Sequence, residues 1–227
     1  IGFGYLEIGT VTPKPQFGNP KPRIFRITNE TAIINHLGFN NKGINHMKAK
    51  LSDFDRTIPI GINIGKNSST PIDKAYQDYE YCMKEIFYLA DYITLNISSP
   101  NTENLRDLQL GQFFEDFLKN IKRLHNNLIK KYKKHVPLII KISPDIALKD
   151  LNKLGLLLLE YEIDGVIATN TTVDKNVLKS KKFRDFKGGV SGKPIINKSN
   201  KIIEQLANLL NKKITIIGVG GLTSPSA

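Results

Sequence analysis

Short apolar stretches rich in β-branched residues alternate along the chain with longer segments of helical periodicity. The apolar stretches predict six strands, at residues 5–9, 58–64, 92–97, 138–142, 165–168 and 214–219. The helical patterns lie near residues 75–89, 112–132, 148–161 and 199–210. Nearly continuous apolar strands separated by helices are typical of a parallel sheet that is covered on both faces. The sequence therefore predicts the α/β class.

Polar and glycine residues follow every predicted strand. The strand ends read "EIGT", "GINIGKN", "LNISSPN", "IIKISPD", "VIATNTT" and "IIGVGG". An open sheet places its ligand at one switch point, whereas a β/α barrel builds its site from many strand ends. The pattern thus favours a (β/α)8 TIM barrel of which roughly six of the eight strands are present. Because the chain opens and ends abruptly, we expect residues 1–227 to be one domain truncated at both ends.

Two segments between the first two predicted strands depart from the alternation. The stretch "TVTPKPQFGNPKPRIFR" contains four prolines, which disfavour both helix and central strand, so we expect an excursion over the mouth of the barrel. The stretch "AIINHLGFNNKG" contains Asn35, Asn40 and Asn41. One interpretation is a loop whose asparagines tolerate left-handed conformations. The other is that their amides bind a polar, planar ligand.

Four asparagines are candidate binding residues because they fall at predicted strand ends or in this loop. They are Asn35, Asn96, Asn101 and Asn170. A side-chain amide donates and accepts at once, so several amides can hold a ring with alternating C=O and N–H groups. This arrangement suits a pyrimidine-like substrate. The alternative is that the amides only stabilise turns and helix caps.

Lys141 interrupts an otherwise apolar strand, between Ile140 and Ile142. An unpaired buried ammonium is costly, so the side chain must point into the barrel or pair with another group, unless it lies at a solvated strand edge. Inside a barrel it could act as a Schiff-base nucleophile, or as a fixed cation that stabilises negative charge on a reduced cofactor.

Two late glycine clusters suggest a phosphate site. They are "GGVSG" at residues 188–192 and "GVGG" at residues 218–221. Glycines let backbone amides approach a phosphate closely, and barrels often bind phosphate after their last strands. Together with Lys141 and the asparagines, they indicate a phosphorylated cofactor such as flavin mononucleotide (FMN).

Composition limits the other possibilities. The chain has 33 Lys+Arg against 21 Asp+Glu, a formal charge of +12, which favours anionic partners without choosing among them. The lysines are scattered, and they lack the interleaved aromatics of a nucleic-acid surface, so we expect a solvated face and no nucleic-acid partner. Cys82 is the only cysteine, which excludes a disulfide framework or a cysteine-based metal site and favours a reducing compartment. We expect no bound metal.

The ordered set of motifs resembles a known family. "EIGTVTPKPQFGNPKPRIFR", "INHLGFNNKG", "GINIGKN", "NISSPNTENLR", "IKISPD", "DGVIATNTT", "GGVSG" and "IIGVGG" look like dihydroorotate dehydrogenases of the quinone-linked, membrane-associated class 2. The resemblance implies an FMN enzyme of de novo pyrimidine synthesis that oxidises (S)-dihydroorotate to orotate and passes electrons to a quinone. It also implies a protein peripheral to a membrane, which it meets through the missing N-terminal part. That membrane is the cytoplasmic face of the cell membrane in a bacterium, or the mitochondrial inner membrane in a eukaryote.

The resemblance also implies residue roles. Ser99 matches the base that removes the C5 proton, while hydride passes from C6 to N5 of FMN. The substrate would be held by Asn35, His36, Leu37, Gly38, Phe39, Asn96, Asn101, Asn170 and Thr171. The flavin would be held by Thr10, Asn63, Asn96, Lys141, Thr169, Gly192 and Gly221. The family usually has glycine where this chain has Asn104, in a turn that we expect to need a positive φ.

Two alternative enzymes remain at this point. The soluble fumarate- or NAD-linked dihydroorotate dehydrogenases carry cysteine in place of Ser99, which argues against them. A Schiff-base aldolase would use Lys141 on the same kind of barrel strand.

Overall fold

A six-stranded parallel sheet forms the centre of the protein, seen in a computed structural model that describes residues 2–223. Its order is β1-β4-β5-β6-β7-β9 and every neighbouring pair is parallel. The strands are β1 (Leu6–Val11), β4 (Ile60–Ile64), β5 (Tyr92–Asn96), β6 (Leu138–Ile142), β7 (Gly165–Ala168) and β9 (Thr215–Gly218). All six predicted strands are confirmed, and so is the α/β class.

The sheet curves around an interior, as the wall of a barrel does. Glu7 on β1 and Lys141 on β6 approach to 3.6 Å between Oε1 and Nζ, although β4 and β5 lie between their strands. In a flat sheet three strand spacings would separate these strands by about 14 Å. The side chains meet because the strands wrap towards one another. The chain therefore supplies six strands of a β/α barrel.

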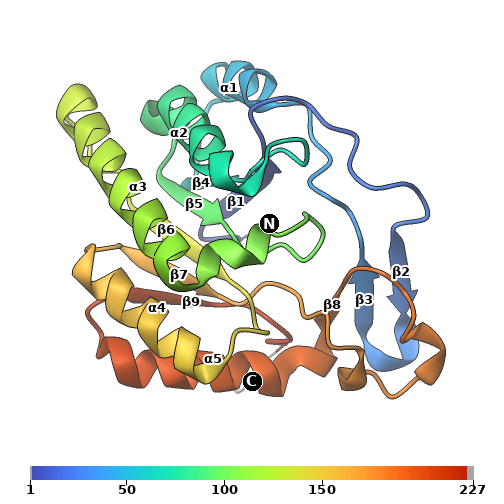
Figure 1. Ribbon diagram of the computed structural model, residues 1–227. Coiled ribbons are helices and arrows are strands. Elements are labelled where there is room, and N and C mark those ends of the chain that lie inside the picture. The colour runs from blue at the N-terminus through green and yellow to red at the C-terminus, as the bar shows by residue number, and fades with distance from the viewer. Residues whose placement is uncertain (1, 224–227) are drawn as a thin grey trace.

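Five α-helices connect the strands and cover the outside of the sheet (Figure 1). They are α1 (Ile44–Ser52), α2 (Ala75–Ile86), α3 (Gly111–Tyr132), α4 (Leu148–Glu160) and α5 (Ile196–Leu210). Short 3-10 helices occur at Thr28–Glu30, Ile72–Lys74, Phe87–Leu89, Leu105–Gln109, Lys175–Val177, Lys181–Phe183 and Lys193–Ile195. Within the described residues, no helix combines the length and the apolar character needed to cross a membrane.

The α3 helix illustrates how the amphipathic pattern sets the packing. Its buried residues recur at spacings of three and four and present one apolar face to the strands: Phe114, Phe117, Leu118, Ile121, Leu124, His125 and Leu128. The helix ends where Lys133 adopts a left-handed conformation with φ of 51°. The four predicted helices are confirmed, although the segment predicted to end at residue 89 closes in a 3-10 turn after Ile86.

Helix α1 was not predicted. Only Ile44 and Leu51 of its nine residues are buried, so its apolar pattern is too sparse to indicate a helix. It follows Gly43, whose φ of 84° turns the chain into the helix.

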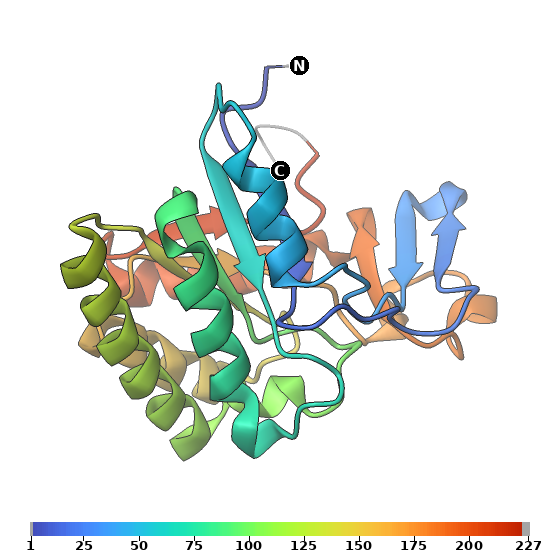
Figure 2. The same cartoon turned by 90° about the horizontal axis from the view of Figure 1, so that it is seen from above.

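A separate antiparallel sheet corrects the loop interpretation of residues 32–35. It consists of β2 (Ile24–Ile27), β3 (Ala32–Asn35) and β8 (Gly189–Gly192) in the order β2-β3-β8. Residues 32–35 were interpreted as loop, but they form the strand β3 because Ile27, Ala32, Ile34 and Val190 are buried in a second small core. Four residues of the predicted phosphate-binding cluster, 189–192, form β8. Figure 2 shows this sheet to one side of the barrel strands.

The proline-rich segment runs without helix or strand from residue 12 to residue 23, apart from one bridge between Gln16 and Asn41. The side chain of Asn67, just beyond β4, holds it. Its Oδ1 accepts from the Lys14 backbone N–H at 2.9 Å, and its Nδ2 donates to Gln16 Oε1 at 2.8 Å. In turn, Gln16 Nε2 donates to Gly38 O at 2.9 Å. The predicted excursion is confirmed as non-helical, and it braces the loop after β3.

Gly188 offers a test of the pairing between β3 and β8 in the small sheet. Its φ is 108°, and a Cβ there would lie 2.1 Å from the backbone oxygen of Asn35. We expect Gly188→Ala to lower the free energy of unfolding by about 3 kcal/mol, since it combines backbone strain with a clash that backbone must relieve. The midpoint of urea denaturation measures this loss.

Gly111 provides the matched control, because its φ is also positive, at 55°, yet a Cβ there would meet no atom within 4 Å. Gly111→Ala should lower the free energy of unfolding by only about 1 kcal/mol. Equal midpoints for the two variants would show that the close approach of Gly188 to Asn35 is unimportant.

Candidate active site

A polar cavity of about 290 Å³ opens at the carboxyl ends of the barrel strands. Residues from the ends of β1, β3, β5, β6 and β7 line it: Gly9, Thr10, Asn35, Leu37, Gly38, Phe39, Asn40, Asn96, Ser99, Pro100, Asn101, Lys141, Asn170 and Thr171. The structure thus brings together Ser99, Lys141 and all four predicted asparagines. Gly9 and Pro100 are lining residues that the sequence analysis did not select, since neither carries a functional group.

The four asparagine amides form two pairs across the cavity. Asn101 Nδ2 donates to Asn35 Oδ1 at 3.0 Å. Asn170 Nδ2 donates to Asn96 Oδ1 at 3.3 Å. Each pair joins segments that are far apart in sequence, so these amides do more than stabilise local turns. The turn interpretation also holds in part, because Asn96 Oδ1 accepts from the backbone N–H of Ser98 at 3.3 Å.

His36 lies behind this wall. Its Nδ1 is 3.1 Å from Asn101 Oδ1, and it does not line the cavity. The structure therefore places His36 as a support of Asn101.

Ser99 is almost completely buried, with 5% of its surface exposed. Its Oγ accepts a hydrogen bond from the backbone N–H of Asn101 at 3.2 Å. The neighbouring Thr171 has a buried Oγ1 that finds no hydrogen-bond partner in the described part of the chain. Buried polar atoms are normally paired, so an unpaired hydroxyl in a cavity wall is suited to bind a ligand.

Lys141 points into the barrel interior, as one of the two predicted placements requires. Its side chain is 20% exposed and its ammonium faces Glu7. Of the described residues that line the cavity, Lys141 alone carries a charge. The cavity therefore presents amides, hydroxyls and one cation.

Asn63 and Thr10 extend the hydrogen bonds of the cavity lining towards the barrel interior. Thr10 Oγ1 donates to Asn63 Oδ1 at 2.6 Å and accepts from Asn96 Nδ2 at 3.0 Å. Asn63 is 3% exposed and reaches the cavity only through Thr10.

The predicted phosphate residues lie outside the cavity lining, near the start of α5. Gly221 has a φ of 77°, and a Cβ there would lie 2.8 Å from the backbone oxygen of Gly192 and 3.1 Å from the backbone nitrogen of Ile196. Of the residue 188–192 cluster, Gly192, the last residue of β8, is the member that contacts Gly221. Thr169 is buried at the end of β7 and donates from its backbone to Val219 O at 2.7 Å. These residues form a glycine-lined cradle at a helix N-terminus, a geometry suited to phosphate.

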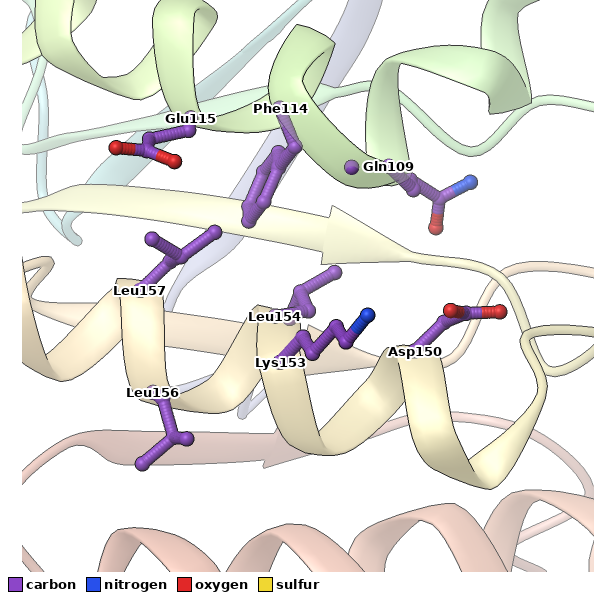
Figure 3. Close-up of a pocket in the computed structure, with 9 residues that line it drawn as sticks. Gln109, Phe114, Glu115, Asp150, Lys153, Leu154, Leu156 and Leu157 are labelled. Carbon is purple, nitrogen blue, oxygen red and sulfur yellow. The ribbon is translucent and has the colours of Figure 1, made fainter.

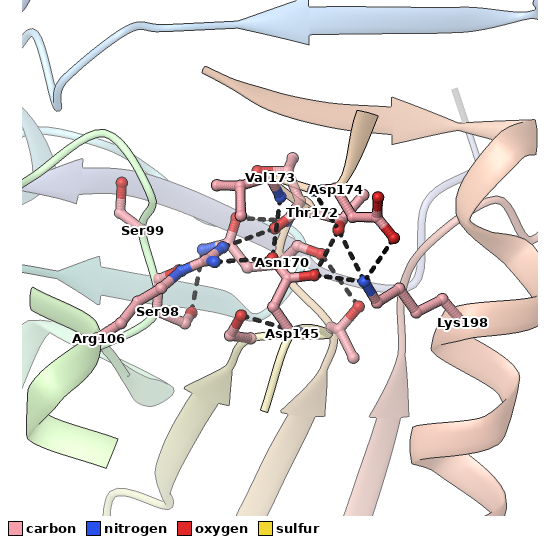
Figure 4. A network of polar contacts seen from close by, with 12 residues as sticks. Ser98, Ser99, Arg106, Asp145, Asn170, Thr172, Val173, Asp174 and Lys198 are labelled. Carbon is pink, nitrogen blue, oxygen red and sulfur yellow. Dashed lines mark hydrogen bonds and ion pairs between the residues drawn. The ribbon is translucent and has the colours of Figure 1, made fainter. Parts of the chain in front are cut away.

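Arg106 ties the loops of the cavity together, and the sequence analysis did not select it (Figure 4). Its guanidinium donates to Ser98 O at 3.1 Å, to Asp145 Oδ2 at 2.7 Å and to Thr171 O at 2.9 Å. One side chain thereby fixes the segments that follow β5, β6 and β7. The signal in the sequence was its position inside "NISSPNTENLR", but its partners could not be inferred from spacing.

Asp145 is the hub of the same network. It accepts hydrogen bonds from Thr172 Oγ1 and, at 2.9 Å, from the backbone N–H of Val173, and it pairs with Lys198 at 2.7 Å. Burial by itself would raise the pKa of Asp145, but the hydrogen bonds from Lys198, Thr172, Val173 and Arg106 outweigh it, so the pKa is lowered. The carboxylate is charged at neutral pH and joins α5 to the cavity loops.

Asn104, which was expected to need a positive φ, adopts a left-handed conformation with φ of 56°. The expected positive φ is confirmed. Asparagine tolerates this region better than most residues, so the turn that carries Arg106 is retained.

A second cavity, of about 300 Å³, lies between α3 and α4 (Figure 3). Phe114, Leu154 and Leu157 line it, with Glu115 and Lys153 among its charged residues. It contains none of the predicted site residues. The cavity at the strand ends is therefore the candidate active site.

Fold and cavity together define a β/α-barrel protein whose ligand site is built from amides, hydroxyls and one lysine at the carboxyl ends of the strands. Comparison with known proteins gives the family. The family model for dihydroorotate dehydrogenase matches residues 1–226, and the chain belongs to this family.

Its relatives include two proteins named dihydroorotate dehydrogenase (quinone). The protein of Buchnera aphidicola subsp. Schizaphis graminum is 51% identical over 224 residues, covering 99% of this chain and 67% of that protein. The protein of Aeromonas salmonicida is 47% identical over 227 residues, covering 100% of this chain and 68% of that protein. The chain thus spans about two thirds of the length of these relatives.

A solved structure shares the fold. The crystal structure of the dihydroorotate dehydrogenase of Eimeria tenella in complex with ferulenol superposes with a TM-score of 0.89 at 34% identity, covering 98% of this chain and 65% of that chain.

The Asp145 network predicts a pH-dependent stability. Because the pKa of Asp145 is lower in the folded protein than in the unfolded chain, where it is about 3.9, its contribution is fully present above that value. It is lost as the pH falls through the lower, folded pKa. We expect Asp145→Asn to lower the free energy of unfolding by about 2 kcal/mol at pH 7. Below about pH 4 the difference in unfolding free energy between the variant and the wild type should become smaller. Urea denaturation at a series of pH values measures this.

Asp185 supplies the control, since it is exposed on a loop. Asp185→Asn should change stability by less than about 0.5 kcal/mol at any pH. A constant difference between Asp145→Asn and wild type from pH 7 to pH 2 would contradict the assigned role of the carboxylate.

Proposed function

We propose that this protein oxidises (S)-dihydroorotate to orotate in pyrimidine biosynthesis, with a bound FMN as the first electron acceptor and a quinone as the second. The observation that carries the proposal is the convergence of Ser99, four asparagine amides and Lys141 on one cavity in a chain of the dihydroorotate dehydrogenase family. The quinone follows from the names of its relatives.

The residues present fit FMN. The cradle of Gly192 and Gly221 at the start of α5 suits its phosphate, and Lys141 suits the negative charge that a flavin gains on reduction. In this proposal the cofactor is held by Thr10, Asn63, Asn96, Lys141, Thr169, Gly192 and Gly221. When bound, FMN supplies the chemistry by accepting a hydride from C6 of the substrate at its N5.

The amide pairs suit the substrate ring. Dihydroorotate alternates C=O and N–H groups, and an asparagine can serve both kinds. Asn35, Asn96, Asn101 and Asn170 would hold the ring, with Leu37, Gly38 and Phe39 closing the cavity over it. His36 would act indirectly, by orienting Asn101. The buried Thr171 hydroxyl, which lacks a partner in the described residues, would find one in the substrate.

Ser99 is proposed to remove the proton from C5 of dihydroorotate. A serine hydroxyl is a poor base in water, so it needs a dry site and a route for its own proton. Its burial supplies the first condition. The Thr171 hydroxyl, in the same cavity wall, is proposed as the first step of the exit.

The aldolase alternative is disfavoured by the family of the chain, because the dihydroorotate dehydrogenase model matches residues 1–226. The soluble fumarate- or NAD-linked enzymes are disfavoured by Ser99 and by the names of the relatives. Because quinones reside in lipid, we propose that the protein works at a membrane surface. That surface is the cytoplasmic face of the cell membrane in a bacterium, or the mitochondrial inner membrane in a eukaryote.

An anaerobic visible spectrum tests the function. A bound flavin should bleach when dihydroorotate is added and should recover its colour with a quinone, but not with fumarate or NAD. A colourless protein, or a flavin that dihydroorotate does not bleach, would rule the proposal out.

Ser99→Ala should lower turnover at least a hundredfold, since it removes the proposed base, while flavin remains bound. Ser99→Cys should shift the pH–rate profile to lower pH, because a thiol ionises more readily than a hydroxyl. Steady-state rates and flavin content measure both effects.

Ser98 is the matched control: it is buried one residue away but does not line the cavity. Ser98→Ala removes its hydrogen bond with Asn170 and should lower turnover far less than Ser99→Ala. Equal losses in the two variants, or loss of flavin from Ser99→Ala, would remove the basis for Ser99 as the base.

A further inference from the structure

We propose that Glu7 is a positioning residue that sets both the direction of the hydrogen bonds under the cavity and the effective charge of Lys141. This inference rests on the proposed function, because its consequence is measured on the flavin. Glu7 lies on β1, in the strand end "EIGT", and does not line the cavity.

The Glu7 carboxylate receives three groups from three other strands. Its Oε1 accepts from Asn63 Nδ2 on β4 at 2.9 Å and lies 3.6 Å from Lys141 Nζ on β6. Its Oε2 accepts from Thr94 Oγ1 on β5 at 2.8 Å. The side chain is 21% exposed, so these contacts lie in the partly dry interior of the barrel.

A carboxylate can only accept, and this fixes the orientation of Asn63. Asn63 must turn its Nδ2 towards Glu7 and its Oδ1 towards Thr10, whose hydroxyl donates to it at 2.6 Å. The Thr10 oxygen is then left to accept from Asn96 Nδ2 at 3.0 Å. Asn96 consequently turns its Oδ1 to Asn170. One partly buried charge thus determines which face of each amide meets a ligand.

The same carboxylate partly neutralises Lys141. An ammonium without a counterion would attract the negative charge of a reduced flavin more strongly than one paired at 3.6 Å. Glu7 therefore keeps the flavin from becoming too weak a reductant for the second half of the reaction, in which electrons leave for the quinone.

Glu7→Gln separates the two effects. A glutamine can keep its Oε1 towards Asn63 and Lys141 and turn its Nε2 to Thr94, whose hydroxyl can accept as well as donate. The orientation is retained and the charge is lost. Glu7→Leu, by contrast, removes both the charge and the acceptor.

The test measures the two-electron potential of the bound flavin by equilibration with a reference dye, in the protein purified with its flavin. Glu7→Gln should favour the reduced flavin about tenfold, a rise of about 30 mV for two electrons. Glu7→Leu should also weaken flavin binding about tenfold. Thr94→Val, which removes one hydrogen bond to Glu7 without changing charge, should leave the potential unchanged.

The outcomes are distinct from those that test the proposed function. If wild-type flavin is not bleached by dihydroorotate, the function fails, yet a raised potential in Glu7→Gln still supports the role of Glu7. If Glu7→Gln has the wild-type potential, or shares its shift with Thr94→Val, the role of Glu7 is overturned while the function stands. A wild-type protein that holds no flavin would overturn both.

Discussion

Polar side chains buried at the carboxyl ends of the strands must find hydrogen-bond partners, and this requirement organises the upper half of the molecule. The partners come from other strands and not from neighbouring residues. Asn63 joins Glu7 to Thr10, Asn96 joins Thr10 to Asn170, and Arg106 joins three loops at once. The groups that line the cavity are oriented by hydrogen bonds to one another. The network thus fixes which way each of these amides points.

The barrel elements could be predicted because each carries its own signal. A strand buried on both faces is a short apolar run, and a helix on its outside repeats every three to four residues, as α3 does. The small sheet has no such signal: β3 is four residues long and pairs with β8, in which two of four residues are glycine. Helix α1 buries two residues only. When an element forms because of a partner far away in the sequence, the local pattern of residues is not enough to predict it.

The same distinction holds for the site. Ser99, Lys141 and the asparagines could be selected because polar residues directly after apolar strands share one rim of a barrel. Glu7, Arg106 and Asp145 could not, since their roles lie in contacts between different strands and loops, such as Arg106 with Asp145 and Glu7 with Lys141. Their sequence context is ordinary for charged residues near a strand end. The residues that line the cavity were thus easier to find than the residues that hold them in place.

The pairing of β3 with β8 has a consequence for the order in which the protein is made. Asn35 pairs with Gly189, and Glu7 reaches Lys141, so both walls of the cavity join the first part of the chain to a much later part. During synthesis the early strands emerge with their polar ends unpartnered. The strand β3, which carries Asn35, gains its partner β8 only after residue 192 has been translated. Until then β3 has only β2 beside it, so the wall that holds Asn35 is secured late in the synthesis of the described residues.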